Sequence, residues 1–213
     1  MMYGSVQASC GLYSVKRTVL FDGRIPVYHL YHGSKNDDAS TIITTFPFKK
    51  PGISGRRGSN QTRAILQAIP VGAADFRVDR LNLMGIAAAK GSRFGLTGVM
   101  FAHPCGIPME LVENAGDSRP PIVNDAAGIT AAHGIRGIFG ATVAVTDSTA
   151  MDEFIEGALE FACVAKSDDG SMWIVPEMNG LCSVIEVVTD RDSPQGTWTL
   201  AGGTVPSGVQ PHG

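Results

Sequence analysis

The chain has 213 residues, of which 44% are hydrophobic and 17% are charged. This composition is typical of a folded globular protein and excludes wholesale disorder. The net charge is −3, but residues 1–93 hold thirteen Lys and Arg against five Asp and Glu, whereas residues 94–213 hold four against fifteen. Such a split favours two kinds of contact: the basic part with a polyanion, or the basic part of one copy with the acidic part of the next.

The N-terminal part predicts a β-hairpin. Two alternating runs rich in β-branched residues flank Asp22-Gly23, a dipeptide typical of a type I′ turn. We therefore expect strands at residues 12–21 and 25–32. A third strand is expected at residues 41–48, where Pro47 and the following Pro51 end it.

Residues 49–63 form a basic, Gly-rich segment that contains no acid. Its glycines and its proline predict a mobile loop rather than a regular element. Cations on such a loop can contact phosphates or a neighbouring subunit, and the candidates are Lys49, Lys50, Arg56, Arg57 and Arg63. The segment contains no aromatic residue for base stacking. A short helix is expected to follow it, from Ser59 or Asn60 to Pro70.

The middle of the chain gives weaker signals. A polar stretch at 72–80 leads into an Ala-rich helix expected at 81–90, and an apolar run predicts a buried strand at 96–102. Residues 124–136 favour a helix weakly, because two glycines interrupt them. A further strand is expected at 141–146.

The clearest helix signal begins at Thr149, a capping residue that Asp152 follows three positions later. Apolar residues then recur at helical spacing, which predicts an amphipathic helix. Its expected outer face is acidic and contains Asp152, Glu153, Glu156 and Glu160. Three strands are expected after it, at 161–166, 171–176 and 181–189, and an edge strand is expected at 197–200.

Together these elements predict a single α+β domain over residues 1–213, with a mainly antiparallel sheet. It would combine the extended N-terminal hairpin, the basic loop 49–63, a C-terminal helix plus three-stranded meander, and a C-terminal tail at 201–213.

One group of residues suggests nucleophilic catalysis. His103 and Cys105 lie in a loop bounded by Gly and Pro, and Asp125 and His133 could complete a Cys–His–acid arrangement. A reactive thiolate needs a nearby imidazole, but a buried, inert thiol is the more usual state of a free cysteine. This set is therefore an alternative hypothesis, and we assign no catalytic residue.

The five histidines and four cysteines show no metal-ligand spacing, and no nucleotide-binding motif is present. We therefore expect no metal and no cofactor. The sequence contains neither a secretion signal nor a membrane span, which favours a cytoplasmic protein or a virion protein made in the host cytoplasm.

Low charge, the basic–acidic split and the absence of a catalytic motif favour a self-assembling structural subunit. A virion shell (capsid), tail-tube or decoration protein would form a homo-oligomer through basic-to-acidic heterologous contacts. The alternative is a small-molecule enzyme with a cysteine/histidine site near Cys105. A second alternative is an accessory protein that binds nucleic acid through residues 49–63.

Overall fold

The computed structural model describes residues 9–21, 26–36, 38–46, 53–56, 59–103, 108–176, 183–194, 197–200 and 203–206. Their contacts divide the chain into two compact units. Unit 1 contains Met1–Pro47, Ala64–Gly140 and Glu177–Val184, and unit 2 contains Phe48–Arg63, Ala141–Pro176 and Ile185–Gly213.

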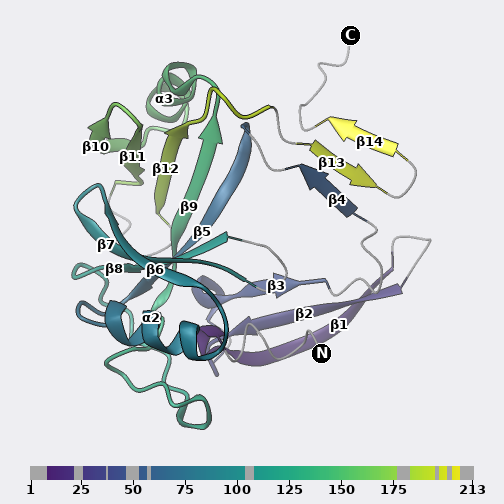
Figure 1. The fold of residues 1–213 in the computed structure, drawn as a ribbon, viewed down its shortest axis with the longest axis vertical. Helices are drawn as coiled ribbons and strands as arrows, with labels where there is room; N and C mark the ends of the chain where they lie inside the picture. The colour runs from purple at the N-terminus through teal and green to yellow at the C-terminus, as the bar shows by residue number, and fades with distance from the viewer. Residues whose placement is uncertain are drawn as a thin grey trace. The chain divides into compact units, whose positions relative to one another are not determined.

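Strands dominate both units. The strands are β1 (Tyr13–Phe21), β2 (Pro26–Gly33), β3 (Ile43–Thr45), β4 (Ile53–Arg56), β5 (Gln61–Ile69), β6 (Ala88–Arg93), β7 (Leu96–Ala102), β8 (Pro108–Glu113), β9 (Gly137–Val145), β10 (Ala162–Ser167), β11 (Gly170–Ile174), β12 (Val184–Thr189), β13 (Thr197–Leu200) and β14 (Gly203–Pro206). The α-helices with described bounds are α2 (Ala74–Leu83) and α3 (Ser148–Gly157), and residues 9–10 are also helical (Figure 1).

Hydrogen bonds join these strands into three sheets. The largest has eight strands in the order β10-β11-β12-β9-β5-β8-β7-β6, and the orders of the two small sheets are β1-β2-β3 and β14-β13-β4. The large sheet is mixed, because β5 runs parallel to β8 whereas β8 runs antiparallel to β7. The predicted α+β fold, with its C-terminal helix plus meander, is therefore wrong. The chain is mostly β, and β10–β12 form one end of the eight-stranded sheet.

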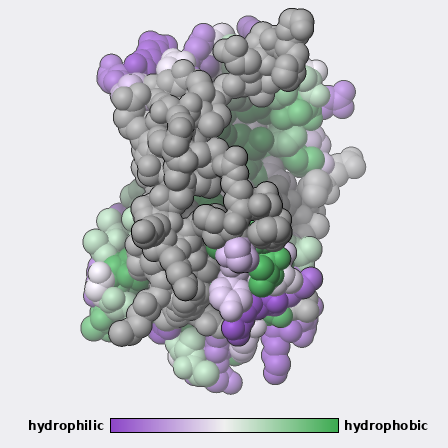
Figure 2. Space-filling view, turned by 90° about the vertical axis from the view of Figure 1, so that its right-hand side faces the viewer, coloured by the Kyte–Doolittle hydropathy of each residue, from purple (hydrophilic) through white to green (hydrophobic). Residues whose placement is uncertain are grey.

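The N-terminal hairpin is confirmed by β1 and β2, which pair antiparallel from Tyr13 opposite Gly33 to Phe21 opposite Pro26. The turn residues Asp22-Gly23 lie outside the described residues. The expected third strand is shorter than 41–48, because β3 covers only Ile43–Thr45. Figure 2 shows hydrophobic residues among hydrophilic ones on the face toward the viewer. In this hairpin, Val19 and Tyr28 are 59% and 48% exposed.

The expected helix between Ser59 and Pro70 is wrong, because residues 61–69 form β5. A short apolar run fits a buried strand as well as one helix face, and only a pairing partner decides between them. Here β5 pairs in parallel with β8, and its last four residues, 66–69, are all buried. Residues 49–63 also contain regular structure, since β4 and the start of β5 fall within the expected loop.

A contact distant in sequence decides where α2 begins. Ala73 at the N-cap has no capping side chain, and Glu113 Oε1 instead accepts the backbone N–H groups of Gly72 and Ala74, both at 2.9 Å. An acceptor at the first turn satisfies orphan helix donors. The polar stretch 72–80 is therefore mostly helical, and the helix expected at 81–90 is wrong because α2 ends at Leu83 and β6 starts at Ala88.

The remaining expected elements differ less from those in the structure. In place of the weak helix at 124–136 there is a 3₁₀ turn over Asp125–Ala127. The strands expected at 96–102, 141–146, 161–166, 171–176 and 181–189 are confirmed as β7, β9, β10, β11 and β12, with shifted ends. Part of the predicted tail 201–213 is strand β14.

The core of unit 1 packs α2 against one face of β7 and β8. Leu81 of the helix, Val99 of β7 and Leu111 of β8 are fully buried in the same cluster. Arg77 of α2 is also fully buried, and it donates to the carbonyl oxygens of His133 (2.5 and 2.9 Å) and Cys10 (3.1 Å). Burial lowers the pKa of this guanidinium to about 10, so it stays charged at neutral pH.

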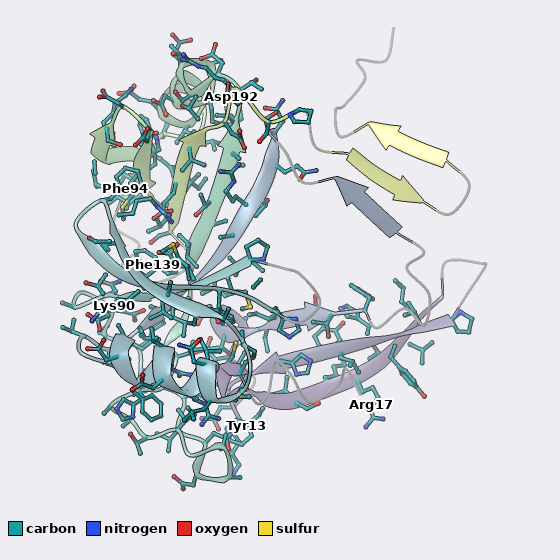
Figure 3. The ribbon with its side chains drawn as sticks, viewed as in Figure 1. Tyr13, Arg17, Lys90, Phe94, Phe139 and Asp192 are labelled. Atoms are coloured by element: carbon teal, nitrogen blue, oxygen red, sulfur yellow. The ribbon has the colours of Figure 1, made fainter. Side chains whose placement is uncertain are left out.

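The turn between β6 and β7 is strained at Phe94, which Figure 3 labels. Phe94 and Gly95 both have positive φ, 52° and 78°, as a two-residue type I′ turn requires. A bulky side chain in this region costs about 1–2 kcal/mol, whereas Asn tolerates it. We expect Phe94→Asn to raise the free energy of unfolding by about 1 kcal/mol in urea denaturation. The matched variant Phe94→Leu keeps the strain, so a gain as large as that of Phe94→Asn would contradict this explanation.

Unit 2 has its own apolar cluster, formed by Ile155 of α3, Trp173 of β11 and Val187 of β12 with Val145 of β9. The helix predicted after Thr149 is confirmed as α3, but Asp147 is its N-cap and accepts the N–H of Thr149 at 2.9 Å.

Asp152 corrects the predicted acidic face, because it is buried rather than exposed. Its carboxylate accepts hydrogen bonds from Lys166 Nζ (2.8 Å), Ser171 Oγ (2.6 Å) and Trp173 Nε1 (3.2 Å). Burial alone would raise the pKa of Asp152, but these hydrogen bonds outweigh it and hold the pKa below its ordinary value. The outer face of α3 therefore keeps only Glu153 and Glu156 of the predicted set, while Glu160 lies beyond the end of the helix at Gly157; all three are exposed.

Candidate functional site

Successive side chains of β7 and β8 point to opposite faces of the sheet. Val99 and Leu111 point toward α2, so Met100 and Glu110, which lie opposite each other in the register, point to the other face. On β6, Arg93 reaches this second face, and its Nη2 contacts Glu110 Oε2 at 2.7 Å. These three residues, Arg93, Met100 and Glu110, are named here the Arg93 face.

The Arg93 face combines a fixed charge with accessible apolar surface. Glu110 is 7% exposed, while Met100 next to it is 41% exposed. Gly98 leaves room for the carboxylate, because a Cβ there would lie less than 3.0 Å from Glu110 Oε1. The buried carboxylate therefore orients a guanidinium that stays about one-third exposed (31%).

Lys90 provides a contrast on the same strand. It lies opposite Val99 in the register and therefore points to the α2 side, where Nζ contacts Asp75 Oδ1 at 2.5 Å (Figure 3). Both side chains of this pair are largely solvent-exposed, at 48% and 79%. An exposed pair of this kind contributes little to stability and orients no buried group.

Unit 2 also holds a carboxylate inside an apolar strand. Glu186 of β12 is 2% exposed, and its Oε2 accepts a hydrogen bond from Thr142 Oγ1 of β9 at 2.8 Å. Neither Glu110 nor Glu186 is predicted as a functional residue from the sequence pattern. Each is a charged residue within an otherwise apolar run of sequence. Such a residue needs a hydrogen-bonding partner when its strand is buried.

The predicted cysteine–histidine set is only partly described. Cys105 lies outside the described residues. His103 is buried, Asp125 is exposed, and His133 stacks on Phe76 at 3.8 Å between ring centroids. The ring of His133 also bonds Thr130 Oγ1 through Nδ1 at 3.1 Å. The Cys–His–acid arrangement therefore stays a prediction.

The predicted basic segment is described mainly at its end. Arg63 forms an ion pair with Asp190 of the same unit. Lys49, Lys50 and Arg57 lie outside the described residues, and the side chain of Arg56 is not described. The pairing of Arg63 within its own chain weakens the expectation that it contacts a polyanion or another copy.

In the part of the chain that the structure describes, no three His, Cys, Asp or Glu side chains lie together as a metal site requires. Among the same residues, no helix is both long and apolar enough to cross a membrane.

Comparison with known proteins gives the chain a family context, although no family model matches it. It is 30% identical over 199 residues to the chlorohydroquinone/hydroquinone 1,2-dioxygenase of Sphingobium indicum. It also superposes on a putative dioxygenase from Bacillus subtilis with a TM-score of 0.77 and 27% identity, over 94% of this chain and 62% of that one. The chain is similar to ring-cleaving dioxygenases.

The similarity covers 90% of this chain but only 60% of the Sphingobium enzyme. Glyoxalase I from Zea mays, at 12% identity, superposes with a TM-score of 0.62 over 91% of this chain and 65% of that one. This likeness shows that the fold is glyoxalase-like.

These findings overturn the predicted function. Ring-cleaving dioxygenases act on small molecules, so the prediction of a self-assembling virion shell, capsid, tail-tube or decoration subunit is wrong. The similarity supports the alternative of a small-molecule enzyme better than the main prediction. Association with copies of itself and nucleic-acid binding through residues 49–63 stay predictions.

A ring-cleaving dioxygenase implies a redox metal, and non-haem iron oxygenases hold it with two histidines and one carboxylate. The described residues do not fit this requirement by themselves. Glu110 is paired with Arg93 and Glu186 is bonded to Thr142, and neither belongs to a cluster of three potential ligands. We therefore derive no step of dioxygen chemistry from them.

Proposed function

We propose that the protein acts on a hydroxylated aromatic ring, as an enzyme of the ring-cleaving dioxygenase class. In such a reaction one carbon–carbon bond of the ring breaks and both atoms of O2 enter the product. The similarity to chlorohydroquinone/hydroquinone 1,2-dioxygenase over 90% of this chain carries the proposal.

The Arg93 face suits the binding part of this function. A hydroxylated ring has an apolar body and polar or anionic oxygens, and ligand sites typically pair apolar surface with a few fixed polar groups. Met100 offers the apolar surface, and the guanidinium of Arg93 offers N–H donors to a phenolic oxygen. The ion pair with Glu110 keeps these donors in place when no ligand is bound.

The first test measures the reaction. The protein is incubated anaerobically with Fe(II) and mixed with hydroquinone or chlorohydroquinone in air-saturated buffer, and an oxygen electrode follows O2. We expect one O2 consumed for each ring lost. Oxygen uptake that continues without loss of the ring, or no uptake with either substrate, would reject ring cleavage.

The second test assigns the binding residue. Arg93→Ala removes a charge-assisted hydrogen bond that contributes about 1.5–3 kcal/mol, so we expect KM, or Kd for the ring measured by calorimetry, to rise about tenfold or more. Lys90→Ala is the matched control, because it removes a cation of the same strand from the opposite face. Equal effects of the two variants would reject the assignment, and Arg93→Lys, which retains the charge, should restore part of the affinity.

A further inference from the structure

The eight-stranded sheet has two outer strands, β6 at one end and β10 at the other, and among the described strands β10 pairs only with β11 (Figure 1). The outer side of such a strand presents backbone N–H and C=O groups that can pair with another strand. Charged side chains discourage this pairing, and β6 contains Lys90 and Arg93. The first four residues of β10, at 162–165, are instead small or apolar and carry no charge.

The side chains of β10 are also accessible. Every residue of the strand except Ala165 is exposed, and Val164 in its middle is 48% exposed. Apolar surface continues just before the strand, where Leu159 is 41% exposed. An outer strand with accessible apolar side chains is the kind of surface to which another strand adds.

A bulge shapes this edge of the sheet. Cys163 lies opposite Trp173 and Ala165 lies opposite Met172, so Val164 is the extra residue. A bulge bends an outer strand and can turn it away from a neighbour. Because Val164 is exposed and uncharged, neither burial nor charge removes this edge from contact.

The sequence around Cys163 is complementary to itself. If two copies of β10 pair antiparallel about a two-fold axis at Cys163, residues equally distant from position 163 lie opposite each other. Ala162 then lies opposite Val164 of the second copy, and Glu160, just before the strand, lies opposite Lys166 of the second copy. Glu160 and Lys166 are both exposed and opposite in charge, and the axis forms this contact twice.

Charge distinguishes this register from its neighbour. A two-fold axis at Val164 would place Glu160 opposite Asp168 of the second copy, and both residues are exposed acids. Like charges directly opposite each other destabilise a strand pair. The register centred on Cys163 is therefore the favoured one of the two.

The contacts of Lys166 within its own chain permit this pairing. Its Nζ contacts Asp152 Oδ2 at 2.8 Å, while its side chain is 66% exposed. An ammonium group has three N–H donors, so it can bind a second carboxylate as well as the first.

We propose that β10 binds β10 of a second copy of this chain, antiparallel and centred on Cys163, to form a two-fold symmetric homodimer. The pairing joins two eight-stranded sheets through backbone hydrogen bonds, and the two Glu160–Lys166 contacts fix its register. This inference goes beyond the proposed function and does not require ring cleavage.

Sedimentation equilibrium over a range of protein concentrations tests the dimer. We expect a monomer–dimer equilibrium, and we expect Glu160→Lys, which places like charges at both ends of the pairing, to raise the dimer Kd about fivefold or more. Glu153→Lys is the matched control, because it makes the same charge reversal at an exposed position of α3 outside the register. It should change Kd by less than about twofold.

Two outcomes of this measurement would overturn the proposal. One is a monomeric mass at every concentration, which would leave the edge to another segment of this chain or to a different protein. The other is equal weakening of the dimer by Glu160→Lys and Glu153→Lys, since a general effect of charge would then explain both.

Chemical cross-linking tests the register in the unaltered protein. Cys163 is a free and exposed thiol, and the proposed axis places its Cβ atom about 4.5–5.5 Å from that of the second copy. A short bismaleimide should therefore link two copies, and Cys163→Ser should remove the link. A link that persists in Cys163→Ser, or a dimer whose Cys163 thiols cannot be linked, would overturn this pairing. Because these experiments report association alone, a dimer that consumes no O2 would reject ring cleavage but not this interface.

Discussion

Replacing Gly140 by Ala should destabilise the protein strongly. Gly140 lies in β9, and a Cβ at this position would lie less than 3.0 Å from the carbonyl oxygen and carbon of Val184 in β12. These are backbone atoms, so no side-chain rotation can relieve the clash, and the strands must separate. We expect the free energy of unfolding to fall by about 3 kcal/mol, measured by urea denaturation followed by circular dichroism.

Gly157→Ala is the matched control for Gly140→Ala. Gly157 is the last residue of α3, and a Cβ there meets no atom within 4 Å. Because Ala favours a helix over Gly, we expect this variant to be unchanged or more stable by up to about 1 kcal/mol. If both substitutions changed stability alike, the close approach of Gly140 to Val184 would not be the cause.

The second large effect should come from Asp152→Ala. The substitution removes the acceptor of three hydrogen bonds, from Lys166, Ser171 and Trp173. Ser171 and Trp173 keep one contact with each other at 2.7 Å, while the ammonium of Lys166 reaches solvent. We expect a loss of about 2–3 kcal/mol at pH 7, because buried donors lose their partner. Glu153→Ala, an exposed neighbour on α3, should change the free energy of unfolding by less than about 0.5 kcal/mol.

The effect of Asp152 should depend on pH. A carboxylate whose pKa is lowered in the folded state stabilises the fold above its unfolded pKa, about 3.9. This contribution is lost as pH falls through the lower folded pKa. The difference in stability between the unaltered protein and Asp152→Ala should therefore be full at pH 7 and 5 and should shrink below about pH 4. A difference that stays constant down to pH 2 would show that packing, and not the charge, sets the effect.

The sequence predicted correctly the elements that a pattern of a few neighbouring residues specifies. The hairpin signal around Asp22-Gly23 found β1 and β2, and the apolar spacing from Met151 to Leu159 found α3. The errors arose where a distant contact decides. Residues 61–69 became a strand through parallel pairing with β8, and α2 begins where Glu113 accepts its first N–H groups.

The candidate site likewise depends on contacts between residues that are distant in the sequence. Cys105 and His103 stand out in the sequence by their flanking Gly and Pro, but no local pattern links Arg93 to Glu110, which lies 17 positions later in the chain. The opposite charges of the two halves suggested contacts between copies. In the structure, Arg63 and Arg93 of the basic half instead pair with Asp190 and Glu110 of the same chain.

The sequence by itself determined that the chain folds into a globular protein, where the hairpin lies, and that one amphipathic helix precedes three strands. The tertiary structure alone decided that these strands extend one mixed eight-stranded sheet, that Asp152 is buried, and that Arg93 pairs with Glu110. The physical reason is that periodicity and turn chemistry act over a few residues. Strand pairing, the solvation of a carboxylate and the formation of an ion pair between strands depend on residues far apart in the chain, which only the folded backbone brings together.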